Sequence, residues 1–289
     1  MTGGPTQEGP STPVTTPVTP LPPGPSASSP APSAADPVTG APAPTVDPNA
    51  GPSVLGMGVM GGMGQSTDRW QSADVTRDGS NYKFMANGWG PGFTSQSVSW
   101  NGTSFTVVDL EGEQGENYEP CSYPTVFCGQ YSKTSGACGL PAEIASLTSL
   151  RTGWMWAANG NDGEYNAAYD IWLGDGGRFT GFFMVWLRDP PGQQPAGSLQ
   201  EQGVSVANVP GTWDIWSGMV NNHPITNYVR PEGQDSPSLE FDILDFLKDA
   251  AAHDESVPGT QVLAVAVGFE MWNGPFKNLQ VVDFYVDPE

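Results

Sequence analysis

The stretch Asn166–Leu173, which reads NAAYDIWL, decides the fold class of this chain. Successive side chains of an extended strand point to opposite faces. One face of this segment would therefore carry Asn166, Ala168, Asp170 and Trp172, and the other Ala167, Tyr169, Ile171 and Leu173. The run Phe182–Leu187 (FFMVWL) alternates in the same way and has aromatic rings on both faces. Both segments predict strands with a core on one face and a concave or ligand-bearing surface on the other.

From Trp70 onward, short β-branched and aromatic runs alternate with Gly, Asn and Pro, a pattern typical of an all-β sandwich or jelly roll. One helix is predicted from Asp242 to about His253, with Asp242 as its N-cap and with apolar residues at i, i+3, i+4 and i+7. The predicted strands are Tyr82–Met85, Ser104–Asp109, Arg151–Ala157, Asn166–Leu173, Phe182–Leu187, Val204–Val206, Thr212–Ser217, Asn227–Val229, Val262–Glu270 and Gln280–Val286.

The chain divides by composition into three parts. Residues 1–52 are rich in Pro, Thr, Ser and Ala, and such a segment buries too little apolar surface to fold, so an extended, disordered tether is expected. Residues 53–67 are apolar but rich in Gly and Met, and they predict a flexible linker that packs on a partner or on the domain itself. The folded domain is expected at residues 68–289. The tether is either a plain spacer or an attachment to an assembly partner.

The charge balance excludes several partners. Ten Lys and Arg against 31 Asp and Glu give a formal net charge of −21, which repels nucleic acid and anionic membranes. No apolar run reaches the roughly 20 residues of a membrane span, and no signal peptide is recognisable. The two histidines lack metal-ligand spacing, so neither a metal nor a cofactor is expected.

The three cysteines indicate whether the protein works in an oxidising or a reducing compartment. A Cys128–Cys138 disulfide would close a short loop of the kind found in exported domains, leaving Cys121 unpaired. Three reduced thiols are the alternative.

Ten tryptophans are many for a chain of 289 residues. Sugar sites use such rings as platforms, whereas any single Trp is more often packed in a core. The tryptophans that stand beside polar groups favour a sugar-binding cleft; they are Trp89, Trp172, Trp186 and Trp272.

Six motifs in one order resemble glycoside hydrolase family 12, the small endoglucanases and xyloglucanases, in their actinobacterial form. They are GACGLPAEIASLTSLRTGWMW, NAAYDIWL, MVWL, GTWDIWSG, FDILDFLKDA and VGFEMWNG, and they cover Tyr82 to Val286. The resemblance implies a jelly roll of two curved antiparallel sheets with an open cleft on the concave sheet. It also implies a retaining mechanism with two carboxylates about 5 Å apart.

The resemblance assigns roles to several residues. Glu270 matches the family's acid/base, and Asp170 matches the aspartate that orients the nucleophile. Asn87 and Trp89 match the floor of the sugar subsites, and the substrate-binding set is completed by Trp172, Met184, Trp186 and Trp272.

The nucleophile is the one element of the family pattern that the sequence lacks. The family places a Glu directly before the apolar-Met-apolar-Trp run, and Phe182 stands there instead. A phenyl ring cannot form a glycosyl ester, so the retaining reaction should be slower by on the order of 10⁴–10⁶. Phe182 is expected within a few ångström of Glu270. Asp170 or a loop Asp could serve an inverting mechanism instead, which needs a carboxylate about 6.5–9.5 Å from Glu270.

Three hypotheses follow. The first is an inactive, glycan-binding or structural domain on a Pro-rich tether. The second is an active endo-β-1,4-glucanase with Glu270 as acid/base and a non-standard second carboxylate. The third, which overlaps with the first, is a component of an extracellular particle such as the tail of an actinobacterial virus. In each, the partner is a β-glucan or a cell-envelope polysaccharide, and the location is extracellular or particle-associated.

Overall fold

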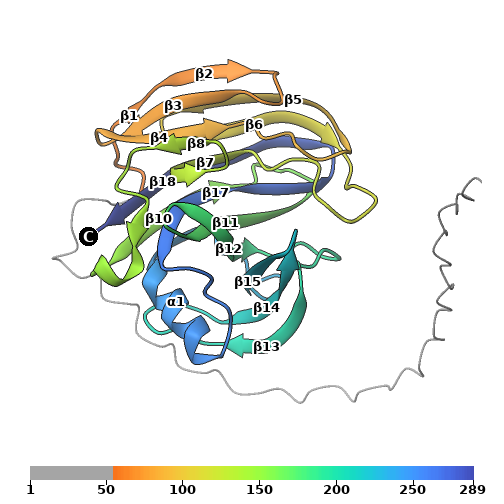
Figure 1. Ribbon diagram of the computed structural model, residues 1–289. Helices are drawn as coiled ribbons and strands as arrows, with labels where there is room; N and C mark the ends of the chain where they lie inside the picture. Colours follow the sequence, from red (N-terminus) through yellow and green to blue (C-terminus); the bar gives the residue numbers. More distant parts are fainter. Residues whose placement is uncertain (1–54) are drawn as a thin grey trace, which may run out of the picture. The chain divides into compact units, whose positions relative to one another are not determined.

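The computed structural model describes residues 55–289, which form two β-sheets and one short α-helix (Figure 1). The predicted tether, residues 1–52, lies outside the described residues. The larger sheet has twelve strands and the smaller has six within the described range. The predicted all-β sandwich with one short helix is confirmed.

The larger sheet carries the concave surface. Its strands follow the order β1 (Met60–Gly61), β3 (Ser72–Arg77), β4 (Ser80–Met85), β7 (Thr125–Tyr131), β17 (Gln261–Asn273), β11 (Glu164–Asp175), β12 (Arg178–Arg188), β15 (His223–Val229), β14 (Trp213–Val220) and β13 (Ser198–Val204), with β8 (Thr134–Gly136) beside β7 and β9 (Ala142–Glu143) beside β17. All pairings are antiparallel except that of β12 with β15, which is parallel. A short 3₁₀ turn, Ile144–Ser146, follows β9.

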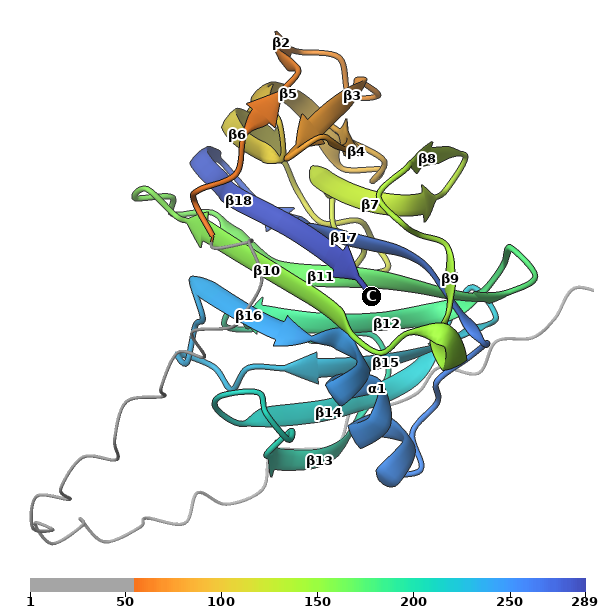
Figure 2. The same cartoon turned by 90° about the vertical axis from the view of Figure 1, so that its left-hand side faces the viewer.

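The smaller sheet covers the opposite face. Its order is β16 (Ser238–Asp242), β10 (Leu150–Ala157), β18 (Phe276–Pro288), β6 (Ser104–Gly112), β5 (Phe93–Asn101) and β2 (Met63–Ser66). Strands β10 and β18 lie over β17, β11 and β12 (Figure 2). Trp154 of β10 contacts Tyr169 of β11 and Phe269 of β17, with ring centroids 5.5 Å and 5.8 Å apart. The hydrophobic core therefore lies between the sheets and leaves the far face of the larger sheet free for a ligand.

The helix α1 (Ile243–Ala252) begins where the sequence predicts. The Asp242 side chain accepts a hydrogen bond from the Leu244 backbone N–H at 2.9 Å and caps the first turn. The Phe246 ring packs against Trp213 and Tyr228 of the larger sheet and against Phe241 of β16. Within residues 55–289 no helix has the length and hydropathy needed to cross a membrane.

The described part of the linker expected at residues 53–67 packs on the domain itself, one of the two alternatives, and does so as strands of the sandwich and not as a flexible segment. Met60–Gly61 pairs with β3, and Met63–Ser66 pairs with β5. Glycine permits this packing: a Cβ on Gly61 would meet the Thr76 hydroxyl, and a Cβ on Gly64 would meet the Trp100 ring, both at 2.4 Å. High glycine content here serves close packing, and the folded domain begins before residue 68.

Candidate functional site

The floor of the concave surface is a set of cross-strand rows. One row joins Asn166 of β11 to Glu270 of β17. The next contains Gly268, Ala168 and Trp186, the third contains Ala266, Asp170 and Met184, and the fourth contains Ala264, Trp172 and Phe182. Small residues on β17 and at Ala168 leave room above the floor between Glu270 and Asp170.

Above this floor lies a cleft of about 640 Å³, a size typical of small-molecule sites. Its lining brings together all nine residues that the sequence assigned to catalysis, substrate binding or the nucleophile position: Asn87, Trp89, Asp170, Trp172, Phe182, Met184, Trp186, Glu270 and Trp272. Their assigned roles remain predictions.

Glu270 is held by Asn166, its neighbour across the strands. The Asn166 amide N–H donates to the Glu270 carboxylate, and the Asn166 carbonyl oxygen accepts from the Glu270 backbone N–H at 3.0 Å. Burial raises the pKa of Glu270 to about 7, the hydrogen bond from Asn166 lowers it, and the charge of Asp170 raises it. A carboxyl group with this pKa is protonated in a large fraction of molecules near neutral pH, as a general acid requires.

Asp170 is buried, with 8% of its surface exposed, and only one of its oxygens is hydrogen-bonded. Oδ2 accepts from the Tyr131 hydroxyl at 2.8 Å and from the Trp172 ring N–H at 3.0 Å. Oδ1 is buried without a hydrogen-bond partner. Burial raises the pKa of Asp170 to about 6, and the two hydrogen bonds lower it. The unpartnered oxygen is where a further polar group would be expected.

Phe182 lines the cleft but does not lie beside Glu270. It is opposite Trp172, which is opposite Ala264, six residues before Glu270 on β17. At roughly 3.3 Å per residue that offset is about 20 Å along the strand, so the pairing does not support the expected close approach. The Phe182 ring instead packs against Trp172 and Phe179, with centroids 6.0 Å and 4.7 Å away.

Strand β12 supplies no carboxylate to the cleft. Its residues in the lining are Phe182, Met184 and Trp186. Met184 is the residue directly opposite Asp170. The motif places the family's nucleophile at Phe182, and the pairing with Asp170 would place it at Met184. Neither side chain has a nucleophilic oxygen.

The four cleft tryptophans differ in exposure. Trp89 is 43% exposed, whereas Trp186 and Trp272 are 2% and 5% exposed. Trp172 is half-buried and is fixed by its hydrogen bond to Asp170. Of these four, only Trp89 therefore presents a broad ring face to the cleft, and Trp186 and Trp272 mainly shape the floor and wall.

Several lining residues were not found from the sequence. On one side of the cleft these are Glu119 and Asn117 of the loop before β7, together with Tyr123 and Tyr131; on the other they are Gln194, Pro195, Ala196, Val220, Asn221 and Ile225. They come from loops and from scattered positions on distant strands, so no local pattern marks them. Glu119 is notable because it gives the cleft a third carboxylate.

The lining divides between β11 and β12 into two sides of different chemistry. We call the polar side the set Asn87, Asn117, Glu119, Tyr123, Tyr131, Asp170 and Glu270, and the apolar side the set Phe182, Met184, Trp186, Pro195, Ala196, Val220 and Ile225; the polar residues Gln194 and Asn221 border the apolar side. No Lys, Arg or His is among the residues that line the cleft. The arrangement can supply a proton from Glu270 and hydrogen bonds to hydroxyl groups, but it has no positive charge to bind an anion.

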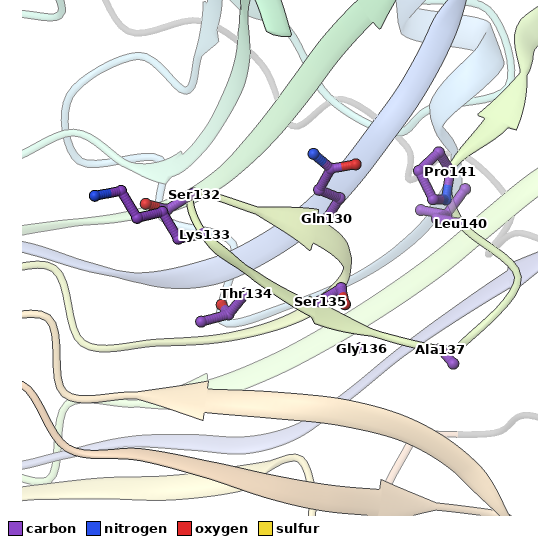
Figure 3. Close-up of a pocket in the computed structure, with 9 residues that line it drawn as sticks. All are labelled: Gln130, Ser132, Lys133, Thr134, Ser135, Gly136, Ala137, Leu140 and Pro141. Carbon is purple, nitrogen blue, oxygen red and sulfur yellow. The ribbon is translucent and has the colours of Figure 1, made fainter. Parts of the chain in front are cut away.

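A second hollow, of about 420 Å³, lies at the β7–β8 hairpin (Figure 3). It is lined by Gln130, Ser132, Lys133, Thr134, Ser135, Gly136, Ala137, Leu140 and Pro141, without an aromatic ring or a carboxylate. It therefore offers neither a ring for sugar stacking nor a carboxyl group for acid–base catalysis.

The structure joins Cys128 and Cys138 in a disulfide with a Cα–Cα distance of 5.7 Å. Cys121 is free and buried, and burial raises the pKa of its thiol to about 12. A buried thiol with this pKa is unreactive at neutral pH.

Comparisons with known proteins agree with this architecture. The chain matches glycosyl hydrolase family 12 over residues 80–289. A xyloglucan-specific endo-β-1,4-glucanase from Emericella nidulans is 27% identical over 150 residues, covering 50% of this chain and 60% of that protein. A probable xyloglucan-specific endo-β-1,4-glucanase from Aspergillus terreus is 26% identical over 137 residues, covering 46% and 54%. The chain thus spans little more than half the length of these relatives.

Solved structures show a more complete correspondence. An endoglucanase from Rhodothermus marinus is 29% identical, with a TM-score of 0.67 over 78% of this chain and 98% of that one. An endo-1,4-β-glucanase described as a cellulase is 27% identical, with a TM-score of 0.67 over 78% and 99%. Because the family match covers most of the chain and the two-sheet fold is shared, this protein belongs to glycosyl hydrolase family 12.

Proposed function

We propose that the cleft binds a β-1,4-linked glucan, such as a cellulose or xyloglucan chain, without cleaving it by the retaining mechanism of the family. The observation that carries the proposal is the lack of any carboxylate on the cleft face of β12, beside an Asp170 oxygen that has no hydrogen-bond partner. Attack on the anomeric carbon requires a nucleophilic oxygen. General acid help from Glu270 alone supplies typically 10²–10⁴-fold, well short of the acceleration that glycoside cleavage demands.

Support for the ligand class comes from the relatives and from the lining. Relatives of known activity are endoglucanases and xyloglucan-specific endoglucanases. The exposed face of Trp89 can stack on a sugar ring, and Asn87 and Asn117 can bond its hydroxyl groups. The absence of cationic lining residues disfavours polysaccharides rich in uronic acid or phosphate.

Calorimetric titration with cellohexaose and with xyloglucan oligosaccharides, followed by chromatography of the mixture, tests this proposal. We expect saturable binding and intact oligosaccharides after prolonged incubation. Chain shortening at ordinary enzymatic rates would refute the loss of hydrolysis, and the lack of any binding would refute the glycan role.

A second candidate, hydrolysis with inversion, is favoured by the state of Asp170. The Oδ1 atom of Asp170 has no hydrogen-bond partner, and burial raises the pKa of this carboxyl group. The charge of Asp170 in turn raises the pKa of Glu270, across the small residues of the floor. In this mechanism Glu270 would protonate the leaving oxygen while Asp170 or Glu119 deprotonates the attacking water. Nuclear magnetic resonance of the first product would show an inverted anomer, and Asp170→Asn or Glu119→Gln would abolish turnover.

We also propose that the domain works outside the cell or on an extracellular particle, such as an actinobacterial virus tail, with residues 1–52 as its attachment to an assembly partner. The Cys128–Cys138 disulfide supports an oxidising location. Thiol titration of the denatured, unreduced protein from its natural source should count one free thiol. Three free thiols would contradict this location.

A further inference from the structure

The apolar side of the cleft is continuous across three neighbouring strands. Phe182 of β12 lies opposite Ile225 of β15, and Ile225 lies opposite Gly218 of β14. Met184 and Val220 pack with them in one hydrophobic cluster that is separate from the core between the sheets. Phe182 and Val220 are half-buried and face the cleft, so the surface is available to a ligand.

A loop completes this surface and is fixed in place. Pro195 and Ala196 line the cleft beside the strands. The backbone of Gly197 crosses β14 so closely that a Cβ on Gly218 would lie 2.5 Å from the Gly197 Cα. The buried Asn227 amide donates to the Ala196 carbonyl at 3.1 Å and to the Trp216 carbonyl at 3.3 Å. The apolar side is therefore preorganised.

A plain glucan chain suits this surface poorly. Hydroxyl groups project from both edges of a β-1,4-glucan, and the polar side can bond one edge through Asn87, Asn117, Asp170 and Glu270. Against aliphatic Met184, Ile225 and Val220 the hydroxyl groups of the other edge would lose water without gaining a partner, which is unfavourable, and Gln194 and Asn221 are the polar side chains that line this side.

We propose that the apolar side binds an alkyl or acyl chain carried by the sugar, so that the ligand of this cleft is an amphiphilic glycoconjugate. This inference rests on the proposed glycan-binding function and names the ligand more closely. The sugar would lie against the polar side and Trp89, and the hydrocarbon chain against Phe182, Ile225 and Val220. Each methylene group removed from water is worth roughly a fourfold gain in affinity.

Calorimetry with a matched pair of ligands, methyl β-cellobioside and octyl β-cellobioside below its micellar concentration, tests the proposal on the full chain. We expect the octyl ligand to bind at least about 50-fold tighter, equivalent to three buried methylene groups. In the double variant Val220→Thr/Ile225→Thr, which places a hydroxyl group at each position and also removes the terminal methyl group at residue 225, this ratio should fall several-fold. Met219→Thr is the control, because Met219 is 62% exposed and does not line the cleft.

The outcomes separate the two proposals. Equal affinities for the two ligands, alongside binding of cellohexaose, would overturn this inference and leave the glycan role intact. An affinity ratio that is unchanged in the folded double variant would also overturn it, because the chain would then bind elsewhere. If neither cellohexaose nor the methyl ligand binds, the proposed function itself fails. Thermal melting checks that each variant is folded.

Discussion

The two sides of the cleft carry opposite chemistry on one continuous sheet. On the polar side, Glu270 has Asn166 bound to both its carboxylate and its backbone, and Asp170 is bound by Tyr131 and Trp172. On the apolar side, Phe182 and Met184 belong to one hydrophobic cluster, and Phe182 also packs against Trp172 and Phe179. The groups that would support a second carboxylate are present, whereas the carboxylate itself is absent. The polar side thus has a hydrogen-bonded carboxyl group in each of two rows, whereas the residues of β12 that line the cleft offer none.

The largest expected effect comes from placing a carboxylate on the apolar side. Phe182→Glu restores the carboxylate of the family motif, but residue 182 is offset by about 20 Å along the strand from Glu270, whereas a retaining pair stands about 5 Å apart, so the release of reducing ends from β-glucan should rise less than about tenfold. Adding Glu270→Gln to this variant should remove the gain.

Met184→Glu should give the larger gain, at least about 10²-fold, since Met184 is the residue opposite Asp170 and lies two residues nearer to Glu270 in the strand register. A gain in hydrolysis in this variant alone would mean that the missing nucleophile belongs at residue 184 and not at residue 182. No gain in either variant, while both still bind cellohexaose, would contradict the view that only the attacking group is missing.

A smaller effect is expected in the pH dependence of stability. The pKa of Glu270 is raised from 4.5 to about 7 by burial, so the folded state binds more protons than the unfolded state across this interval. This contribution is fully present below pH of about 4.5 and is lost as the pH rises through about 7, an effect on the order of 2–3 kcal/mol. Urea unfolding from pH 4 to 8 should show a flatter profile for Glu270→Gln than for the native protein.

Glu111→Gln, an exposed change on β6, serves as the control for that profile. An identical slope in the native protein and in Glu270→Gln would mean that Glu270 titrates normally and is not a poised acid.

The smallest expected effect concerns the exposed ring of Trp89. Trp89→Ala should weaken cellohexaose binding about five- to tenfold through the loss of ring stacking. Trp70→Ala is the control, because Trp70 is 59% exposed but does not line the cleft. Equal affinities for both variants would show that the sugar does not lie on Trp89.

The sequence predicted most strongly those parts whose pattern is local. The alternation of side chains along Asn166–Leu173 predicted opposite faces for Tyr169 and Asp170, and the structure places Tyr169 in the core and Asp170 in the cleft. Asp242 correctly predicted the start of α1. Strands β1, β2, β3, β5, β7, β8, β9 and β16 were missed, and the strand predicted at Val204–Val206 instead runs from Ser198 to Val204. Ser72–Arg77, for example, reads SADVTR and has only one buried apolar side chain, so its pairing depends on neighbours that a local pattern does not show.

The sequence identified most residues on the floor of the cleft but missed most residues of its walls. Glu270, Asp170 and the tryptophans lie in motifs that identify the family, but Glu119, Val220 and Ile225 reach the cleft only through the path of the chain. The distance between Phe182 and Glu270 also depends on strand register, which a two-residue change in the β11–β12 hairpin would alter without changing either motif.

Hydrolysis by the unaltered protein tests the central claim most directly. Native protein and Glu270→Gln should be incubated with β-glucan, xyloglucan and carboxymethylcellulose, and the reducing ends counted against a blank. The account predicts that both proteins stay at background while the native protein still binds cellohexaose. Turnover by the native protein at ordinary enzymatic rates, abolished in Glu270→Gln, would contradict it and would show that the cleft uses another carboxylate as its second catalytic group.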